Sequence, residues 1–489
     1  MILEKLKELS KDTAVYGIST MIGRFLGFML FPIYTNVFSR AEYGYFTLVY
    51  AYLAFLNVVY IYGMDAAFMK YTSLAEGDEK RGTFSTPYLF VVGSTLLFSI
   101  IFYLLLEPIS EGMDLPIEYS NLLIYVIFIL LFDTFALIPF SSLRLERKPQ
   151  KFALIKITNI IINLSLNIIL ILVYGFGIEA IFISNLVASI FSFVALLPEI
   201  IKKLELQIDF VVLRKMLKFG IPYLAAAFTS TIVQVIDVPI VERLTDTATL
   251  GLYRASYKLG IFMMLFVQMF NFAWQPFFLE NAKEENAKEL FAKVFTLFLI
   301  ISAVSWAFLS LFIEDIVQIE IAGRTILGRE FLDGLSIVPI ILLAYLFNGL
   351  YMNFTAGIYI EEKTKYFPLV TIAGASVNIA VNFTLIPIIG IMGAAWATLA
   401  SYIVMAGGLF IVSQKFYKID YEYEKIFKIF FIMGIMATIY YFYENVMNFE
   451  IKILVFLMFI LELFVVRVIK KAELVRILNS FKKKRKVIR

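Results

Sequence analysis

The chain has 489 residues, of which 61% are hydrophobic and 17% charged, whereas a soluble domain has about 45–50% and about 25%. It contains no cysteine and no histidine, which excludes disulfides, thiolate chemistry and any catalytic or metal site built on these residues. The 43 basic and 39 acidic residues leave a net charge of +4. We therefore expect an all-α integral membrane protein that uses no cofactor.

Apolar stretches of about 20 residues, the length of a helix that crosses a bilayer, follow one another along the chain. Six of them precede the polar stretch from Lys202 to Lys218, and eight follow it. The predicted spans are residues 12–37, 45–69, 85–107, 120–143, 152–174, 178–199, 220–243, 251–280, 291–313, 335–360, 366–387, 390–414, 428–446 and 451–469. The sequence thus predicts about fourteen transmembrane helices, an even number.

The distribution of lysine and arginine predicts the orientation, since short cytoplasmic loops hold an excess of both residues. With the N-terminus inside, the cytoplasmic segments hold 33 of these residues and the outer segments hold 7. We therefore expect a multi-pass protein of the cytoplasmic membrane with both termini in the cytoplasm. The basic tail from Lys482 to Lys486 is then expected to lie on the inner leaflet.

An internal repeat relates residues 131–180 to residues 346–395 at a constant offset of 215 residues. The N-terminal ends of the two halves agree more weakly, and Gly44 aligns near Gly251. An offset of six spans predicts two parallel six-helix lobes around a central cavity, as in transporters built from repeats. We assign residues 1–205 to an N-lobe, 206–418 to a C-lobe and 419–489 to an extra helix pair and the tail. The polar identities carry most of the weight: Glu146/Glu361, Lys148/Lys363, Asn163/Asn378, Asn167/Asn382 and Gly175/Gly390.

Arg24 is a charged residue near the middle of the first predicted span. It lies about 12 residues from the inner end, a rise of roughly 18 Å at about 1.5 Å per residue. Intramembrane charges usually face a protein interior or a water-filled cavity. Two interpretations stay open: Arg24 binds an anionic ligand, or it forms a structural pair with a carboxylate such as Asp133 or Asp65.

Three carboxylates inside predicted spans are candidates for coupling to an ion or proton gradient. Asp133 lies near the midplane of the fourth span, Asp65 near the inner end of the second and Asp237 near the outer end of the seventh. Asp65 has the alternative of a cap or a pair with Lys70. The asparagine pairs of the repeat are expected to form hydrogen bonds between helices rather than to bind ligands.

Arg254 and Lys258 lie one helical turn apart at the outer start of the eighth predicted span. They therefore share a face of that helix. They either extend a basic path along the cavity or form a surface pair near the lipid headgroups.

Several stretches of the chain resemble a known family. They include Gly23-Arg24-Phe25-Leu26-Gly27-Phe28, Ser39-Arg40-Ala41-Glu42-Tyr43-Gly44, Gly63-Met64-Asp65, Leu250-Gly251-Leu252-Tyr253-Arg254 and Gly390-Ile391-Met392-Gly393. In order and spacing they are similar to polysaccharide transporters, the O-antigen-type flippases of the multidrug/oligosaccharidyl-lipid/polysaccharide exporter (MOP) superfamily. The chain departs from this family where Asp237 is followed by Val238 instead of a basic residue. It also has Leu30 and Phe31 where the lipid II flippase branch has an Arg-Asp pair, which favours the polysaccharide branch.

The resemblance implies a protein that moves a polyprenyl-pyrophosphate-linked oligosaccharide across the membrane by alternating access. It also implies contact with membrane lipids, coupling to H+ or Na+, and partners among polysaccharide assembly proteins, with no nucleic acid. Arg24 would bind the pyrophosphate through its planar donor fork, with Arg254 and Lys258 nearer the outer mouth. The chain has no GxxxxGK[ST] motif, which argues against direct use of ATP.

Two other functions stay open on the sequence. A multidrug cation exporter of the same superfamily would have an acidic cavity, whereas Arg24 is the deepest central charge of the first lobe. A membrane polymerase or ligase would need a substantial outer loop. The longest outer segment predicted here, Glu314 to Gly334, is short, so we expect no enzyme.

Overall fold

A computed structural model describes residues 23, 26–74, 82–443 and 447–468 of the chain. Arg24 and the basic tail, both singled out above, lie outside the described residues. The helices in chain order are α2 (Phe31–Val37), α3 (Arg40–Ile61), α4 (Met64–Leu74), α5 (Ser85–Leu104), α6 (Leu106–Gly112), α7 (Asn121–Leu145), α8 (Pro149–Ile168), α9 (Glu179–Lys203), α10 (Phe210–Val235), α11 (Asp237–Leu244), α12 (Thr247–Lys258), α13 (Ile261–Asn281), α14 (Ala287–Val317), α15 (Val338–Ile360), α16 (Tyr366–Ile389), α17 (Ile391–Phe416), α18 (Tyr423–Tyr443) and α19 (Phe449–Val465). Shorter elements are the 3-10 helices η2 (Ile117–Tyr119) and η4 (Arg329–Ile337), the π-helical turn η3 (Ile169–Val173), and the strands β1 (Glu320–Ile321) and β2 (Arg324–Thr325).

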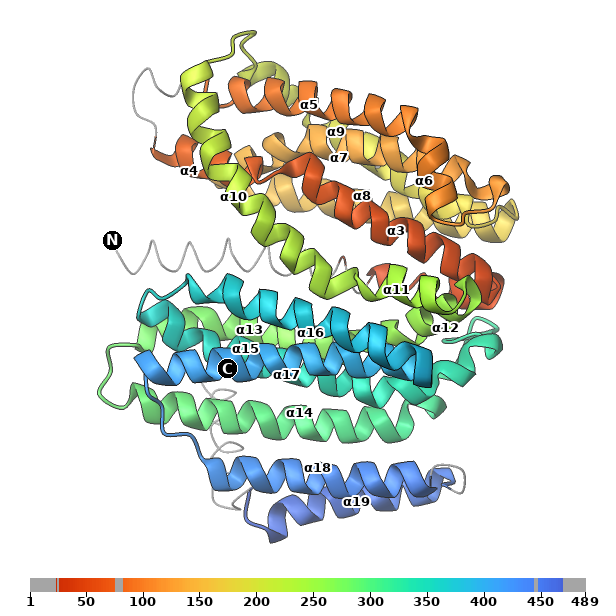
Figure 1. Ribbon diagram of the computed structural model, residues 1–489, viewed down its shortest axis with the longest axis vertical. Coiled ribbons are helices and arrows are strands. Elements are labelled where there is room, and N and C mark those ends of the chain that lie inside the picture. The colour runs from red at the N-terminus through yellow and green to blue at the C-terminus, as the bar shows by residue number, and fades with distance from the viewer. Residues whose placement is uncertain (1–22, 24–25, 75–81, 444–446, 469–489) are drawn as a thin grey trace, which may run out of the picture. The chain divides into compact units, whose positions relative to one another are not determined.

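Within the described ranges, twelve helices are long and apolar enough to cross a membrane, which confirms the all-α membrane fold (Figure 1). They correspond to the second to thirteenth predicted spans. The described part of the first span is the short helix Leu26–Val37, and the fourteenth is α19 with 17 residues.

The seventh and eighth predicted spans are each broken into two helices. The predicted span 220–243 ends as α10 at Val235 and continues as the short helix α11. The predicted span 251–280 consists of α12 and α13, separated at Leu259 and Gly260. Each stretch is apolar enough overall to be predicted as a single span, and the charged residues at its predicted outer end did not indicate a break. The breaks matter because α11 and α12 carry Asp237, Arg254 and Lys258.

The repeat found in the sequence also appears in the backbone. Arg147 and Glu362, which the offset of 215 residues relates, both have positive φ values of 51° and 54°. Gly175 and Gly390 are related in the same way and have φ values of 67° and 58°. Positive φ is uncommon for residues other than glycine. The two halves therefore share local geometry at equivalent turns.

The chain forms two compact units. Unit 1 consists of residues 1–255, 321–331 and 382–391, and unit 2 of the remaining residues. In unit 1, α7 packs against α9, α8 against α9 and α5 against α7, while α10 packs against α3 and α4. The division of the chain into lobes at residues 205/206 and 418/419 stays a prediction, because the units are grouped by contact and the lobes by the repeat.

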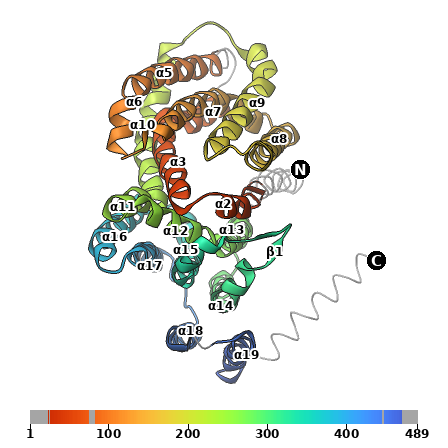
Figure 2. The same ribbon diagram turned by 90° about the vertical axis from the view of Figure 1, so that its right-hand side faces the viewer.

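The extra helix pair α18 and α19 packs on α14 within unit 2 (Figure 2). A buried lysine of α19 forms ion pairs with α14 and stabilises this packing. Lys452 of α19 is 7% exposed, and its ammonium lies 2.7 Å from the Asp315 carboxylate and 3.5 Å from that of Glu314, both on α14. A lysine is almost never this buried unless it is paired.

Inside unit 1, the N-terminal turns of α3 and α12 pack closely against each other at Gly44 and Gly251. A Cβ atom at Gly251 would lie 1.8 Å from the carbonyl oxygen of Arg40, and one at Gly44 would lie 2.0 Å from that of Thr247. The same offset of 207 residues relates Gly44 to Gly251 and Arg40 to Thr247. The contact is therefore reciprocal, as at a two-fold axis.

A break divides the second span inside the bilayer. Tyr62 and Gly63, between α3 and α4, have φ values of 34° and 73°. A Cβ atom at Gly63 would lie 2.6 Å from the carbonyl oxygen of Gly220 on α10. Only glycine permits both this φ and this close approach of two backbones. The break places Asp65 in the first turn of a new helix, α4.

Candidate functional site

A chain of polar side chains runs through the interior of unit 1. The Tyr34 hydroxyl on α2 donates a hydrogen bond of 2.8 Å to the Asn167 side-chain oxygen on α8. The Asn167 amide in turn donates to the Asn163 side chain at 3.2 Å. Tyr34 is 7% exposed and Asn167 fully buried. The predicted role of these asparagines in hydrogen bonds between helices is thus confirmed for Asn167.

A second polar group connects α3, α7 and α9. The Asn185 amide on α9 donates a hydrogen bond of 3.1 Å to the Tyr50 hydroxyl on α3. The Ser189 hydroxyl, one turn further along α9, hydrogen-bonds to the Asp133 carboxylate on α7. The charge of Asp133 also acts on the Tyr50 hydroxyl. The contact between Asn185 and Tyr50 and the contact between Ser189 and Asp133 therefore belong to one polar region. Apolar helices position it: α7 buries Leu130 and Ala136 on either side of Asp133.

Asp133 lies in the polar region as an exposed side chain, although many protein atoms lie around it. Lys156 of α8 has the same combination, and its ammonium lies 4.3 Å from the centre of the Phe140 ring. The charges of Asp133 and Lys156 act on each other. An acid and a base therefore interact within apolar spans, where ionisable groups usually serve a function.

The remaining candidate acids lie in different surroundings. Asp65 is half-buried in the first turn of α4, where the helix dipole stabilises a negative charge. Lys70, its proposed partner, instead places its ammonium 4.1 Å from the centre of the Phe219 ring. Among the residues that the structure describes, Asp65 and Lys70 form no ion pair.

Asp237 and Arg254 come together at the predicted outer end of unit 1. Asp237 is 4% exposed, accepts a hydrogen bond of 2.6 Å from the Tyr253 hydroxyl, and lies 3.5 Å from the Arg254 guanidinium. Much of the charge of Arg254 is therefore compensated within the protein. Lys258 is half-buried at the last turn of α12, in unit 2.

An ion cluster closes the predicted inner ends of α7, α8 and α9. Glu199 is 7% exposed and lies 2.8 Å from the Lys151 ammonium, 3.4 Å from that of Lys203 and 3.5 Å from that of Lys148. Glu146 lies 2.7 Å from Lys148 and also pairs with Lys203. Three ammonium groups thus surround two carboxylates. The cluster fixes three helix ends, and its excess positive charge faces the side predicted to be cytoplasmic.

The Glu146 carboxyl gives this cluster a pH dependence. Partial burial acts to raise the pKa of Glu146, but the hydrogen bonds from Lys148 and Lys203 outweigh it and hold the pKa below its ordinary value. A depressed carboxyl pKa adds stability above the unfolded pKa, and this stability is lost as the pH falls through the folded pKa.

We therefore expect acidification from pH 6 to pH 4 to lower the thermal stability of the wild type more than that of Glu146→Gln. The measurement is the melting temperature of both proteins in detergent across this range. An equal fall in melting temperature for the two proteins would show that Glu146 does not contribute to the pH dependence of stability.

The site combines hydrogen-bonding side chains with an acid and a base, an arrangement that suits the binding of a polar or charged molecule. In the described ranges no group of three or more acidic side chains could hold a metal ion. The sequence pointed to Asp133, Asn163 and Asn167, but not to Tyr34, Tyr50, Asn185 or Ser189. Tyrosine, serine and asparagine are common in membrane helices, so only their contacts identify these four.

Comparisons with known proteins show the family and the fold. A family model described as a polysaccharide biosynthesis protein matches residues 34–333. The chain is similar to the solved structure of the lipid II flippase MurJ in an inward closed conformation, with 19% identity, a TM-score of 0.73 and coverage of 91% of this chain and 98% of the other. It is also similar to an inward-facing multidrug resistance MATE family transporter of the MOP superfamily, with 14% identity, a TM-score of 0.64 and coverage of 82% and 97%. No curated protein matches the sequence.

Proposed function

Because the chain belongs to the polysaccharide biosynthesis protein family, we propose that it is a flippase for a polyprenyl-pyrophosphate-linked oligosaccharide in the cytoplasmic membrane. The observation that carries the proposal is the interacting pair of ionisable groups, Asp133 and Lys156, within apolar spans. The lipid tail of such a substrate can stay in the bilayer, whereas its sugars and pyrophosphate need a polar passage. The likeness to MurJ and to MATE transporters supports a fold suited to transport.

In this proposal Arg24 binds the pyrophosphate, and Arg254 and Lys258 assist nearer the outer mouth. The ion pair between Arg254 and Asp237 makes Arg254 the weaker of these contacts, because its charge is already compensated. Asp65, Asp133 and Asp237 are the candidates for coupling. Asp133 is the strongest of the three, since its side chain is exposed and its charge interacts with that of Lys156.

The experiment that tests the proposed substrate is complementation of a strain that lacks its own O-antigen-type flippase. We expect expression of this protein to restore surface polysaccharide, detected by a lectin on intact cells. A strain that stays without surface polysaccharide but gains resistance to cationic drugs would favour the multidrug exporter instead. Polysaccharide assembly proteins are the partners to seek in the complementing strain.

Asp133→Asn is expected to lower transport driven by an ion gradient by about tenfold and to leave the protein folded. The amide still accepts a hydrogen bond from Ser189 but no longer changes charge with its solvation. The measurement compares wild type and variant in liposomes with an imposed pH or sodium gradient. Glu146→Gln is the matched control, because Glu146 lies just outside the membrane span that carries Asp133 and is not a candidate for coupling. Unchanged gradient-driven transport would remove Asp133 from the coupling step.

A further inference from the structure

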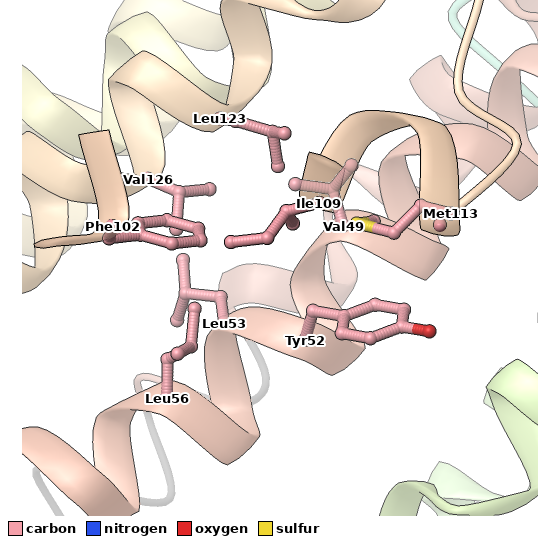
Figure 3. A pocket seen from close by; sticks show the side chains of 10 residues that line it. Val49, Tyr52, Leu53, Leu56, Phe102, Ile109, Met113, Leu123 and Val126 are labelled. Atoms are coloured by element: carbon pink, nitrogen blue, oxygen red, sulfur yellow. The ribbon is translucent and has the colours of Figure 1, made fainter. Parts of the chain in front are cut away.

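An apolar cavity of about 340 Å³ lies in unit 1 between α3, α5, α6 and α7 (Figure 3). Leu53 and Leu56 of α3 form one wall, Phe102 of α5 and Val126 of α7 form the opposite one, and α6 passes over it. Because α6 joins the predicted outer ends of α5 and α7, the cavity lies in the outer half of the bilayer. It is separate from the polar region around Asp133.

The lining of the cavity selects for hydrocarbon. It is apolar apart from Tyr52, whose hydroxyl points away from the aliphatic side chains. The cavity is partly open, and its volume exceeds the roughly 150 Å³ of an engineered apolar cavity that binds benzene. Unfilled apolar space forfeits dispersion contacts, which a hydrocarbon chain would restore. Since the helices around it are membrane spans, a hydrocarbon chain is the occupant that the surroundings supply.

The neighbourhood of the cavity is amphipathic. Next to Phe102, the outward face of α5 carries strongly exposed apolar side chains, among them Tyr103 and Leu104, which a bilayer would cover with lipid. Near Tyr52 lie the charges of Glu242 and Arg243, and the Arg243 guanidinium donates a hydrogen bond of 3.0 Å to the Asp114 carboxylate. A lipid could therefore place its chain in the cavity and its polar end near these charged groups.

We propose that this cavity is a binding site for a single linear hydrocarbon chain, which either a membrane phospholipid or a polyprenyl phosphate supplies. The site does not depend on the proposed transport function, and its occupancy is measured without transport. Its test is photolabelling of the full-length protein in vesicles. One sample contains a phospholipid with a diazirine in its acyl chain, and the other a polyprenyl phosphate with a diazirine in its tail. Adducts are mapped by peptide mass spectrometry.

Gly112→Leu is the variant that fills the cavity. Gly112 lines the cavity at the end of α6, and a Cβ atom added there meets open space, so the larger side chain need not displace its neighbours. Gly93→Leu is the matched control, because Gly93 also has open space around an added Cβ atom but lies exposed on α5. Val126→Phe fills the same cavity from the opposite wall.

We expect at least one probe to label peptides of α3 and α6 in the wild type and in Gly93→Leu. Gly112→Leu and Val126→Phe should each reduce this labelling at least fivefold, while labelling of the lipid-facing residues of α5 stays constant. The probe that labels identifies the source of the chain. Absence of adducts in the cavity with both probes, or adducts that the two filling variants leave unchanged, would overturn the proposal.

Discussion

Arg24→Ala is expected to reduce export of the lipid-linked oligosaccharide by roughly 10- to 100-fold. A hydrogen bond to a charged group contributes about 1.5–3 kcal/mol, and each 1.4 kcal/mol corresponds to about tenfold in affinity. Arg24→Lys keeps the charge but loses the planar fork, so it should be impaired as well, though less. The measurement is export per molecule of inserted protein in the complementation strain.

A structural role for Arg24 predicts a different pattern. Arg24→Ala would then lower expression and melting temperature, and neutralising its paired acid would restore both. Of the two acids considered from the sequence, Asp133 also interacts with Ser189 and with the charge of Lys156, and Asp65 lies at the start of α4. Full export by normally expressed Arg24→Ala would refute the pyrophosphate assignment.

Gly251→Ala is expected to destabilise the protein by about 3 kcal/mol, the upper end of the usual cost of overpacking. The new Cβ atom would lie 1.8 Å from the Arg40 carbonyl oxygen, and backbone atoms cannot rotate away as a side chain can. Gly44→Ala should behave alike, because its Cβ atom would lie 2.0 Å from the Thr247 carbonyl oxygen in the reciprocal contact. The measurement is the melting temperature in detergent, with an expected fall on the order of 5 °C.

Gly93→Ala is the control for both glycine variants. It lies inside helix α5 with nothing close to an added Cβ atom, so alanine should leave stability unchanged or raise it by up to about 1 kcal/mol. If Gly251→Ala melted at the wild-type temperature, the close crossing of α3 and α12 would not contribute to the fold.

The membrane fold followed from the sequence because its signals are local. Twelve predicted spans match helices, since about 20 apolar residues can satisfy their backbone in a bilayer only as a helix. The repeat was also visible, because turns such as those at Gly175 and Gly390 need a special φ that few residues adopt. Both signals can be read from the sequence without knowing which distant segments pack together.

The contacts between distant segments could not be predicted in the same way. Asp237 and Arg254 were assigned to separate spans and separate roles, whereas breaks in those spans bring them within 3.5 Å. Likewise, Gly44 and Gly251 aligned in the sequence, but nothing there indicated that they touch. The partners of Asp133 on α8 and α9 depend on how three helices are rotated about their axes, and apolar sequences specify that rotation weakly.

The most direct test of the proposed function is translocation in purified vesicles. The protein is reconstituted with a polyprenyl-pyrophosphate oligosaccharide, and the fraction of sugar that a membrane-impermeant glycosidase can cleave is followed over time. We predict that wild-type protein exposes sugar from the inner leaflet, faster with an imposed H+ or Na+ gradient, and that Arg24→Ala does so at least tenfold more slowly. A cleavable fraction that stays at the value of protein-free vesicles, while the same vesicles move a cationic dye, would contradict the account.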